Sequence, residues 1–291
     1  MKKQNHFVVL AFFTMIFFAQ RTLGQSIIDG FMTPKKKGSI SVSYSFESYD
    51  EFYLADQRND APGRLGGQVS TQSIGVYAKY GISDRFNVVF NLPYIVAQGD
   101  GNENIPQEDG SFQDQQVQDL QDMSIYLKYK AYEHTFGIGQ LSVIPALGFG
   151  TPLSDYPADD LLSVGNGATF VDMRGIIHFK SNTGLFVEGQ AGHSLRSDEV
   201  PDAWLFAGKL GYAHEKFYID FGFQTQVSDS DAPDIGEAVF SATRVNFTQL
   251  AFSAYYPVVA GIGVSAGVGQ YIDGRNVGRA TRFSGGVVCN F

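Results

Sequence analysis

The chain has 291 residues, and its 21 Lys and Arg against 30 Asp and Glu give a net charge of −9. This acidic balance argues against a nucleic acid as a partner, because phosphate binding needs a basic face. The single cysteine, Cys289, excludes an intrachain disulfide framework, and 33 Gly, 25 Phe and 15 Tyr beside one Trp are typical of a chain rich in strands.

The N-terminal residues have the parts of a secretory signal. A basic start precedes the apolar run 7–19, and small residues follow up to Gly24. We therefore predict cleavage near Gly24, with 1–24 as the signal peptide and 25–291 as a single domain. No later stretch reaches the roughly 20 apolar residues of a membrane helix. If the mature chain enters a membrane, it must do so as strands closed into a barrel.

From about residue 38 onward, apolar and polar residues alternate in segments of about ten residues, which is the pattern of membrane-spanning strands. In 169–180, for example, the odd positions are mostly apolar and the even ones carry most of the charge. The same criterion predicts twelve strands, at 38–49, 68–80, 85–97, 120–132, 136–150, 167–180, 184–195, 202–213, 216–227, 240–256, 259–271 and 279–291.

The spacers between these strands alternate in length. Five are short, at 81–84, 133–135, 181–183, 214–215 and 257–258, and the other six are longer. Bacterial barrels have short periplasmic turns, longer external loops and an even number of strands. The sequence therefore predicts an all-β fold, a transmembrane antiparallel up-and-down β-barrel of about 12 strands, in the outer membrane of a Gram-negative cell. A soluble β-sandwich, the alternative, usually has shorter strands.

The last predicted strand ends in Phe291, preceded by the alternating apolar residues Phe283 and Val287. This ending resembles the signal by which the barrel assembly machinery recognises its clients, so we expect that machinery and outer-membrane lipid as partners. Cys289 alternates onto the lipid face as a small hydrophobic residue. Tyrosines at strand ends predict the aromatic girdles of such barrels: Tyr80, Tyr94, Tyr129, Tyr132, Tyr212, Tyr255 and Tyr256.

Two stretches resemble a known family. Residues 80–88, with the sequence YGISDRFNV, and the following Asn91-Leu92-Pro93-Tyr94 look like a strand–turn–strand motif of the barrel family named for the meta-pathway of phenol degradation. The run 145–155 is similar to a second stretch of that family, although Leu153 and Ser154 replace its usual Thr-Gly pair. The resemblance implies an outer-membrane channel for small aromatic or hydrophobic solutes.

Charged side chains of the strands are expected to face the lumen or to lie at its rims, because a basic residue on the lipid face costs about 2–4 kcal/mol at the midplane. The predicted lumen-lining residues are Lys79, Arg85, Lys128, Lys130, Asp172, Arg174, His178, Lys180, Glu188, Lys209, Asp220, Arg244 and Arg282. This set is mainly basic. It permits two interpretations: a passage that favours anions, or paired charges that hold a filled lumen together.

The long loops are acidic, and their densest group is Asp229, Asp231, Asp234 and Glu237. Carboxylates suit calcium, but this group lacks the spacing of a calcium loop, so we expect a solvated acidic surface. The second long loop, 98–119, is expected either to fold inward as a constriction or to be mobile.

The sequence has no GxSxG or HExxH motif and no cysteine pair, so we expect no enzyme, no cofactor and no metal site. The predicted function is an outer-membrane channel or transporter for passive uptake of small solutes, aromatic or hydrophobic if the family resemblance holds. The alternative is a structural or partner-binding barrel with a closed lumen.

Overall fold

The computed structural model describes residues 27–60, 67–101, 105–106, 112–113, 115–160 and 162–291. The predicted signal peptide lies outside these residues. In the described ranges, no helix is long and apolar enough to cross a membrane. Apart from one 3-10 turn at Phe240–Ala242, the regular structure of these residues is β.

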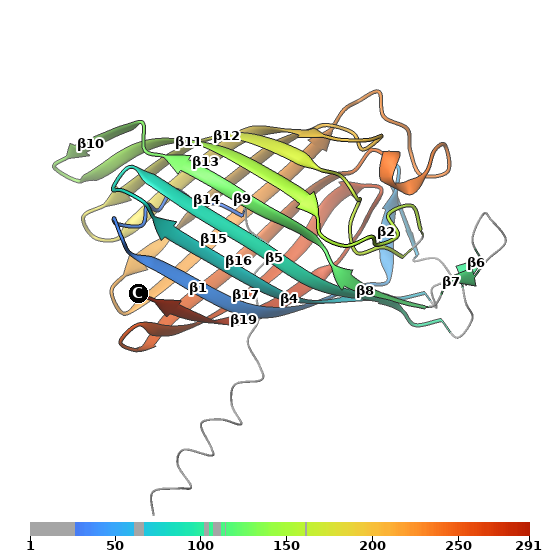
Figure 1. Cartoon of the computed structure of the whole chain (residues 1–291), viewed down its shortest axis with the longest axis horizontal. Coiled ribbons are helices and arrows are strands. Elements are labelled where there is room, and N and C mark those ends of the chain that lie inside the picture. Colours follow the sequence, from blue (N-terminus) through green and yellow to red (C-terminus); the bar gives the residue numbers. More distant parts are fainter. Residues whose placement is uncertain (1–26, 61–66, 102–104, 107–111, 114, 161) are drawn as a thin grey trace, which may run out of the picture.

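The described strands close into one barrel of twelve antiparallel positions (Figure 1). Consecutive positions are neighbours, and the last strand closes the barrel by pairing with the first. The barrel strands are β1 (Gly38–Tyr49), β4 (Val69–Gly81), β5 (Phe86–Gly99), β8 (Gln116–Leu120) together with β9 (Asp122–Tyr129), β11 (Gly139–Pro152), β12 (Phe170–Ser181), β13 (Leu185–Arg196), β14 (Ala203–His214), β15 (Phe217–Ser228), β16 (Asn246–Val259), β17 (Ile262–Arg275) and β19 (Thr281–Asn290). The predicted fold class and strand number are confirmed.

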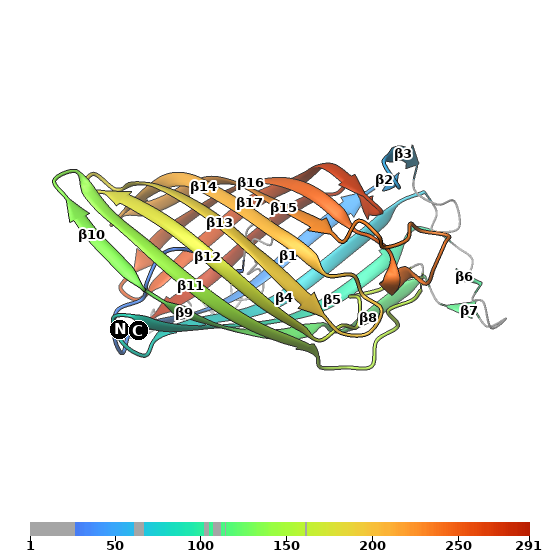
Figure 2. The same ribbon diagram turned by 90° about the horizontal axis from the view of Figure 1, so that it is seen from above.

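The fourth position is built from several pieces, whereas the sequence predicted one strand over 120–132. β8 pairs with one end of β5 and β9 with the other, and Gln121 between them donates its N–H to the Pro93 carbonyl at 3.0 Å. After β9 the chain continues as β10 (Tyr132–Phe136), which pairs only with β11. The β10–β11 hairpin therefore extends past the end of β5 (Figures 1 and 2).

The two ends of the barrel differ, as predicted. Five turns of two to four residues lie at one end. The start of β1 and the C-terminus lie there side by side, and Gly38 and Phe291 exchange backbone hydrogen bonds of 2.9 Å. The six longer connections lie at the other end (Figure 2). We call these the turn end and the loop end.

Small sheets stand at the loop end. β2 (Glu51–Leu54) pairs with β3 (Gln57–Asp60) on one side and with β18 (Val277–Gly278) on the other, which joins the first and last loops. In the second loop, β6 (Ile105–Pro106) and β7 (Phe112–Gln113) form a pair beyond the barrel rim (Figures 1 and 2). This part of the loop does not constrict the lumen, in contrast to one of the two expectations.

The alternation in the sequence separates an apolar outer face from a polar inner one. In β1, Ile40 and Val42 are each 44% exposed on the outside, while Ser43 and Ser45 are buried within the barrel. Cys289 lies on the outer face opposite Ile40, as predicted. The prediction that Tyr255 belongs to a girdle is wrong, because Tyr255 faces the lumen opposite Tyr218. Consecutive residues of a strand point to opposite sides, and the exposed residue here is Tyr256.

Candidate functional site

The half of the lumen near the turn end, which we call the inner half, contains a segment that precedes the first strand. Residues 27–35, which we call the N-terminal strap, enter the barrel at the turn end. Ile28 is fully buried there against inward-facing side chains of four strands, namely Val89, Tyr126, Ile144, Ala146 and Ile176. Burial of an isoleucine side chain stabilises by about 1.5–3 kcal/mol, so this cluster anchors the strap to the wall.

Wall side chains also hydrogen-bond the strap backbone. Gln190 Nε2 donates to the Ile28 carbonyl at 2.8 Å, and Glu188 Oε2 accepts from the Gly30 N–H at 2.7 Å. Asn87 bonds both backbone groups of Thr33, at 2.5 and 2.9 Å. Backbone groups buried in a lumen need such partners, and here the barrel wall supplies them in place of a neighbouring strand.

One buried lysine links the strap to the wall by charge. Lys128 on β9, with a side chain only 2% exposed, lies 3.2 Å from the Asp29 carboxylate and donates to the Phe31 carbonyl at 2.8 Å. A lysine is almost never buried without a partner. Asp29 therefore supplies the counter-charge that lets Lys128 occupy the interior.

The Phe31 ring packs into an aromatic group on β12, β13 and β15. Its centroid lies 4.5 Å from that of His178, 5.0 Å from Phe186 and 6.0 Å from Tyr218, all in edge contacts. The Lys180 amine lies 5.9 Å from the ring centre, within the range of a cation–π contact. The strap thus offers a carboxylate and a ring to the lumen two residues apart.

Gly30, between these two side chains, passes very close to His178. A Cβ added to Gly30 would lie 2.4 Å from the His178 Cβ. His178 cannot easily yield, because its Nδ1 lies 3.0 Å from Glu188 Oε2 and its ring stacks on Phe186. Only glycine fits this position.

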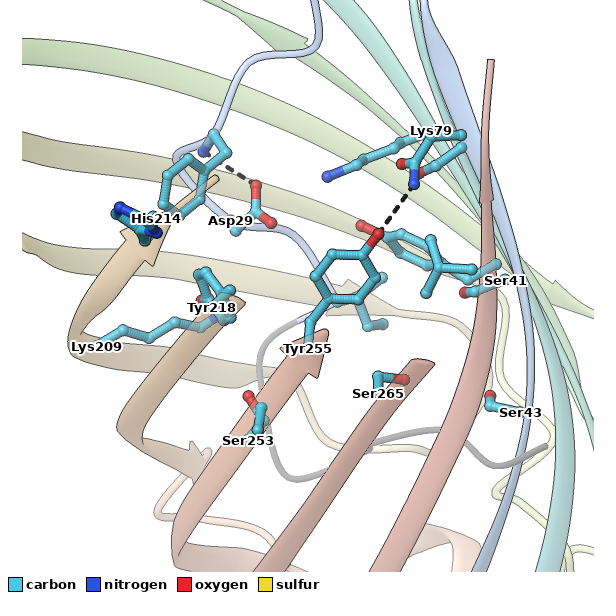
Figure 3. Close-up of a pocket in the computed structure, with 18 of the residues that line it drawn as sticks. Asp29, Ser41, Ser43, Lys79, Lys209, His214, Tyr218, Ser253, Tyr255 and Ser265 are labelled. Carbon is cyan, nitrogen blue, oxygen red and sulfur yellow. Dashed lines mark hydrogen bonds between the residues drawn. The ribbon is translucent and has the colours of Figure 1, made fainter. Parts of the chain in front are cut away.

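A cavity of about 580 Å³ adjoins the strap in the inner half of the lumen (Figure 3). Its volume is in the range of ordinary small-molecule sites. Lys79, Lys180 and Lys209 line it with Tyr218 and Tyr255, and Asn290 Nδ2 donates to the Tyr255 hydroxyl at 3.1 Å. Within the part of the chain that the structure describes, neither Lys79 nor Lys180 has an ion-pair partner.

In the outer half of the lumen, near the loop end, charged side chains of the wall pair with one another instead. Arg174 and Tyr126 both bond Asp172 Oδ2, at 2.8 and 2.6 Å. Arg282 pairs with Glu47 on the neighbouring strand. Paired wall charges thus dominate near the loop end, whereas Lys79 and Lys180 near the turn end have no ion-pair partner among the described residues. A passage that favours anions stays a prediction.

Most residues predicted to line the lumen face inward in the structure: Lys79, Lys128, Asp172, Arg174, His178, Lys180, Glu188, Lys209, Asp220 and Arg282. Three others lie at the rims. Arg85 is exposed in a short turn, Lys130 pairs with Glu133 beside it, and Arg244 is in the loop after β15. Arg85 and Arg244 lie just outside β5 and β16, in contrast to the predicted strands 85–97 and 240–256 that included them.

The acidic residues of the loop after β15 have partners within the protein. The described residues contain no group of three or more His, Cys, Asp or Glu side chains that could hold a metal ion. Asp234 instead binds Arg275 and Asn276, and Asp229 accepts a hydrogen bond from the Asp231 backbone. The calcium hypothesis therefore loses its densest candidate.

Sequence reasoning missed the strap, because it has no strand-like alternation and its partners lie far along the chain. The signal available was the need of Lys128 and Glu188 for partners in a lumen. The sequence Asp29-Gly30-Phe31, placed between the signal and the first strand, offers a carboxylate and free backbone groups that meet this need.

Comparison with known proteins places the fold. No family model and no curated protein matches the sequence, so the predicted phenol-degradation family stays a prediction. The crystal structure of the COG4313 outer-membrane channel from Pseudomonas putida F1 is 14% identical, with a TM-score of 0.69 over 91% of this chain and 100% of that one. The NanC porin is 8% identical, with a TM-score of 0.54 over 87% and 100% of the two chains. This chain therefore has the barrel fold of outer-membrane channels and porins.

Proposed function

We propose that the protein is an outer-membrane channel of a Gram-negative cell, through which small solutes cross passively, and that the N-terminal strap controls passage. The observation that carries this proposal is the cavity beside the strap, inside a barrel with an apolar outer face and a polar inner one. The fold shared with channel and porin structures supports it. The resemblance of residues 80–94 to the phenol-degradation family favours small aromatic or hydrophobic solutes.

A second candidate is a barrel with a closed lumen that serves as a scaffold or binds a partner. The fully buried Ile28 and the paired charges around Asp172 favour it, because both fill the interior. The two candidates differ in whether the strap leaves the lumen. In a channel it moves aside, whereas in a scaffold it is a permanent part of the core.

The test compares the mature protein with a variant that lacks residues 27–33, in planar bilayers and in liposome-swelling assays. The strap pairs with no strand, so we expect the variant to assemble, which is checked by heat-dependent mobility on a gel. The channel proposal predicts measurable conductance for the mature protein and a larger one for the variant. If neither form conducts and neither admits sugars or aromatic acids, the channel proposal is wrong and the closed barrel replaces it.

A further inference from the structure

The two side chains that the strap inserts into the lumen have the chemistry of one small molecule. Asp29 brings a carboxylate to Lys128, and Phe31 brings a ring to His178, Phe186 and Tyr218. Gly30 between them adds no side chain. An aromatic carboxylate has the same two groups, a charged head and a flat apolar body, close together.

The surrounding charges favour an anion at this place. Lys79, Lys128, Lys180 and Lys209 face the inner half of the lumen, where the inward-facing carboxylates of the described wall are Glu188 and Asp220, and Glu215 is exposed at the turn end. Glu188 contacts His178 and Gln190 and acts electrostatically on Lys209, which lies opposite it on β14. Asp220 accepts hydrogen bonds from Tyr218 and Ser253. Asp29 is thus the anion that partly balances the lysines, and Lys79 and Lys209 also act on it electrostatically.

The cavity places a free solute next to this anion. Asp29 and Phe31 both line it, together with Lys79, Lys180 and Lys209 (Figure 3). The exposed residues His214 and Glu215 also line it, so it reaches the turn end of the barrel. A solute in the cavity therefore meets the lysines, the ring of Tyr218 and the strap together.

We propose that this cluster is a binding site for a small aromatic carboxylate, which takes the place of Asp29 at the lysines and of Phe31 among the rings, and so releases the strap. This proposal rests on the proposed channel function and names its solute class. The strap acts as an internal competitor of that solute. A neutral molecule leaves Lys128 without a counter-charge, and a cation is repelled, so neither displaces the strap.

Release of the strap breaks no backbone pairing between strands of the barrel. Its contacts with the wall are the Ile28 cluster, the Lys128 ion pair, the aromatic contacts of Phe31 and side-chain hydrogen bonds, and none of them is a strand pairing. The base of the strap is fixed by backbone hydrogen bonds. The Lys37 N–H donates to the Pro34 carbonyl, and the Lys36 N–H donates to the Gly81 carbonyl. The strap is therefore able to leave as a unit that pivots near Pro34.

The test measures strap release by thiol labelling, independently of conductance. In a Cys289→Ser background, Ile28→Cys places a thiol at a fully buried position, and Met32→Cys provides a second reporter in case the first disturbs packing. The purified barrel is exposed to a water-soluble maleimide in benzoate, in benzamide or in acetate. At a benzoate concentration of ten times its Kd, the released fraction and the labelling rate rise about tenfold.

Benzamide has the ring without the charge and acetate the charge without the ring, so both accelerate labelling less than benzoate. Lys79→Gln or Lys209→Gln raises the benzoate concentration needed for half the effect, whereas Lys216→Gln, an exposed lysine in a turn, leaves it unchanged. Asp29→Asn removes the competing anion, so it raises the basal labelling rate and lowers the benzoate concentration needed.

Two results overturn the proposal: labelling rates that benzoate does not change at either reporter, or equal acceleration by benzamide. Conductance measured on the same protein distinguishes a failure of the proposed binding site from a failure of the proposed channel function. A barrel that responds to benzoate but never conducts overturns the channel and keeps the site. A barrel that conducts without any response to benzoate overturns the site alone.

Discussion

Replacement of Gly30 by Ala perturbs the strap at its closest approach to the wall. The new methyl group would lie 2.4 Å from the His178 Cβ and 2.5 Å from its Cγ, well inside contact distance. Overpacking of this kind costs about 1–3 kcal/mol. Because the strap is outside the sheet, we expect this cost to oppose strap docking and to leave the barrel intact, which lowers the docking equilibrium roughly 5- to 150-fold.

The assay is maleimide labelling of Met32→Cys in the Cys289→Ser background, with and without Gly30→Ala, followed by bilayer conductance. The matched control is Gly189→Ala, because a Cβ there meets nothing within 4 Å. We expect Gly30→Ala to speed labelling and raise conductance while the melting temperature of the barrel changes little. Labelling and conductance equal to those of Gly189→Ala would show that the strap tolerates the methyl group, and the account of Gly30 would be wrong.

Three further predictions concern charge and assembly. Lys79→Gln combined with Lys180→Gln shifts the reversal potential in a salt gradient toward cations; a wild-type barrel that already prefers cations contradicts the reasoning. Hydrogen bonds from Arg275 hold the pKa of Asp234 below its usual value of 3.8. The contact thus stabilises the loop at neutral pH and is lost as the pH falls through that lowered pKa. We expect faster hydrogen exchange of residues 229–245 at low pH, and Asp234→Asn should abolish this pH dependence. We propose that Phe291 is the assembly signal, so Phe291→Ala lowers the yield of folded barrel in cells but not in refolding from detergent.

Alternation was sufficient to predict the barrel, because lipid and lumen impose opposite polarity on successive residues of every strand. It located β1 at 38–49, as observed, and placed Asp172 and Arg174 inside. It failed at Gln121, where one extra residue shifts the register against β5 and reverses which residues of the strand face outward, so one continuous alternation does not describe β8 and β9 together. Residues in turns, such as Arg85, were assigned a face that only a strand possesses.

The functional site could be predicted only in part. The inward lysines follow from the strand pattern, but their partner Asp29 lies 99 residues before Lys128, and Gly30 lies 158 residues before Glu188. Nothing local in the sequence specifies contacts of that separation. The ion pair of Asp172 with Arg174 and the position of Lys79 and Lys180 beside the cavity likewise depend on how the strands are arranged in the barrel, which spacing alone does not give.

The strap also constrains the order of events during folding. Its partners come from β5, β9, β12 and β13, so its docking site is incomplete until most of the chain has been inserted and the barrel has formed. The first described residues of the chain are therefore the last to reach their final place. Until then Lys128, Glu188 and the side chains that surround Ile28 lack their partners on the strap, so a small anion bound to Lys128 would delay docking of the strap without hindering strand pairing.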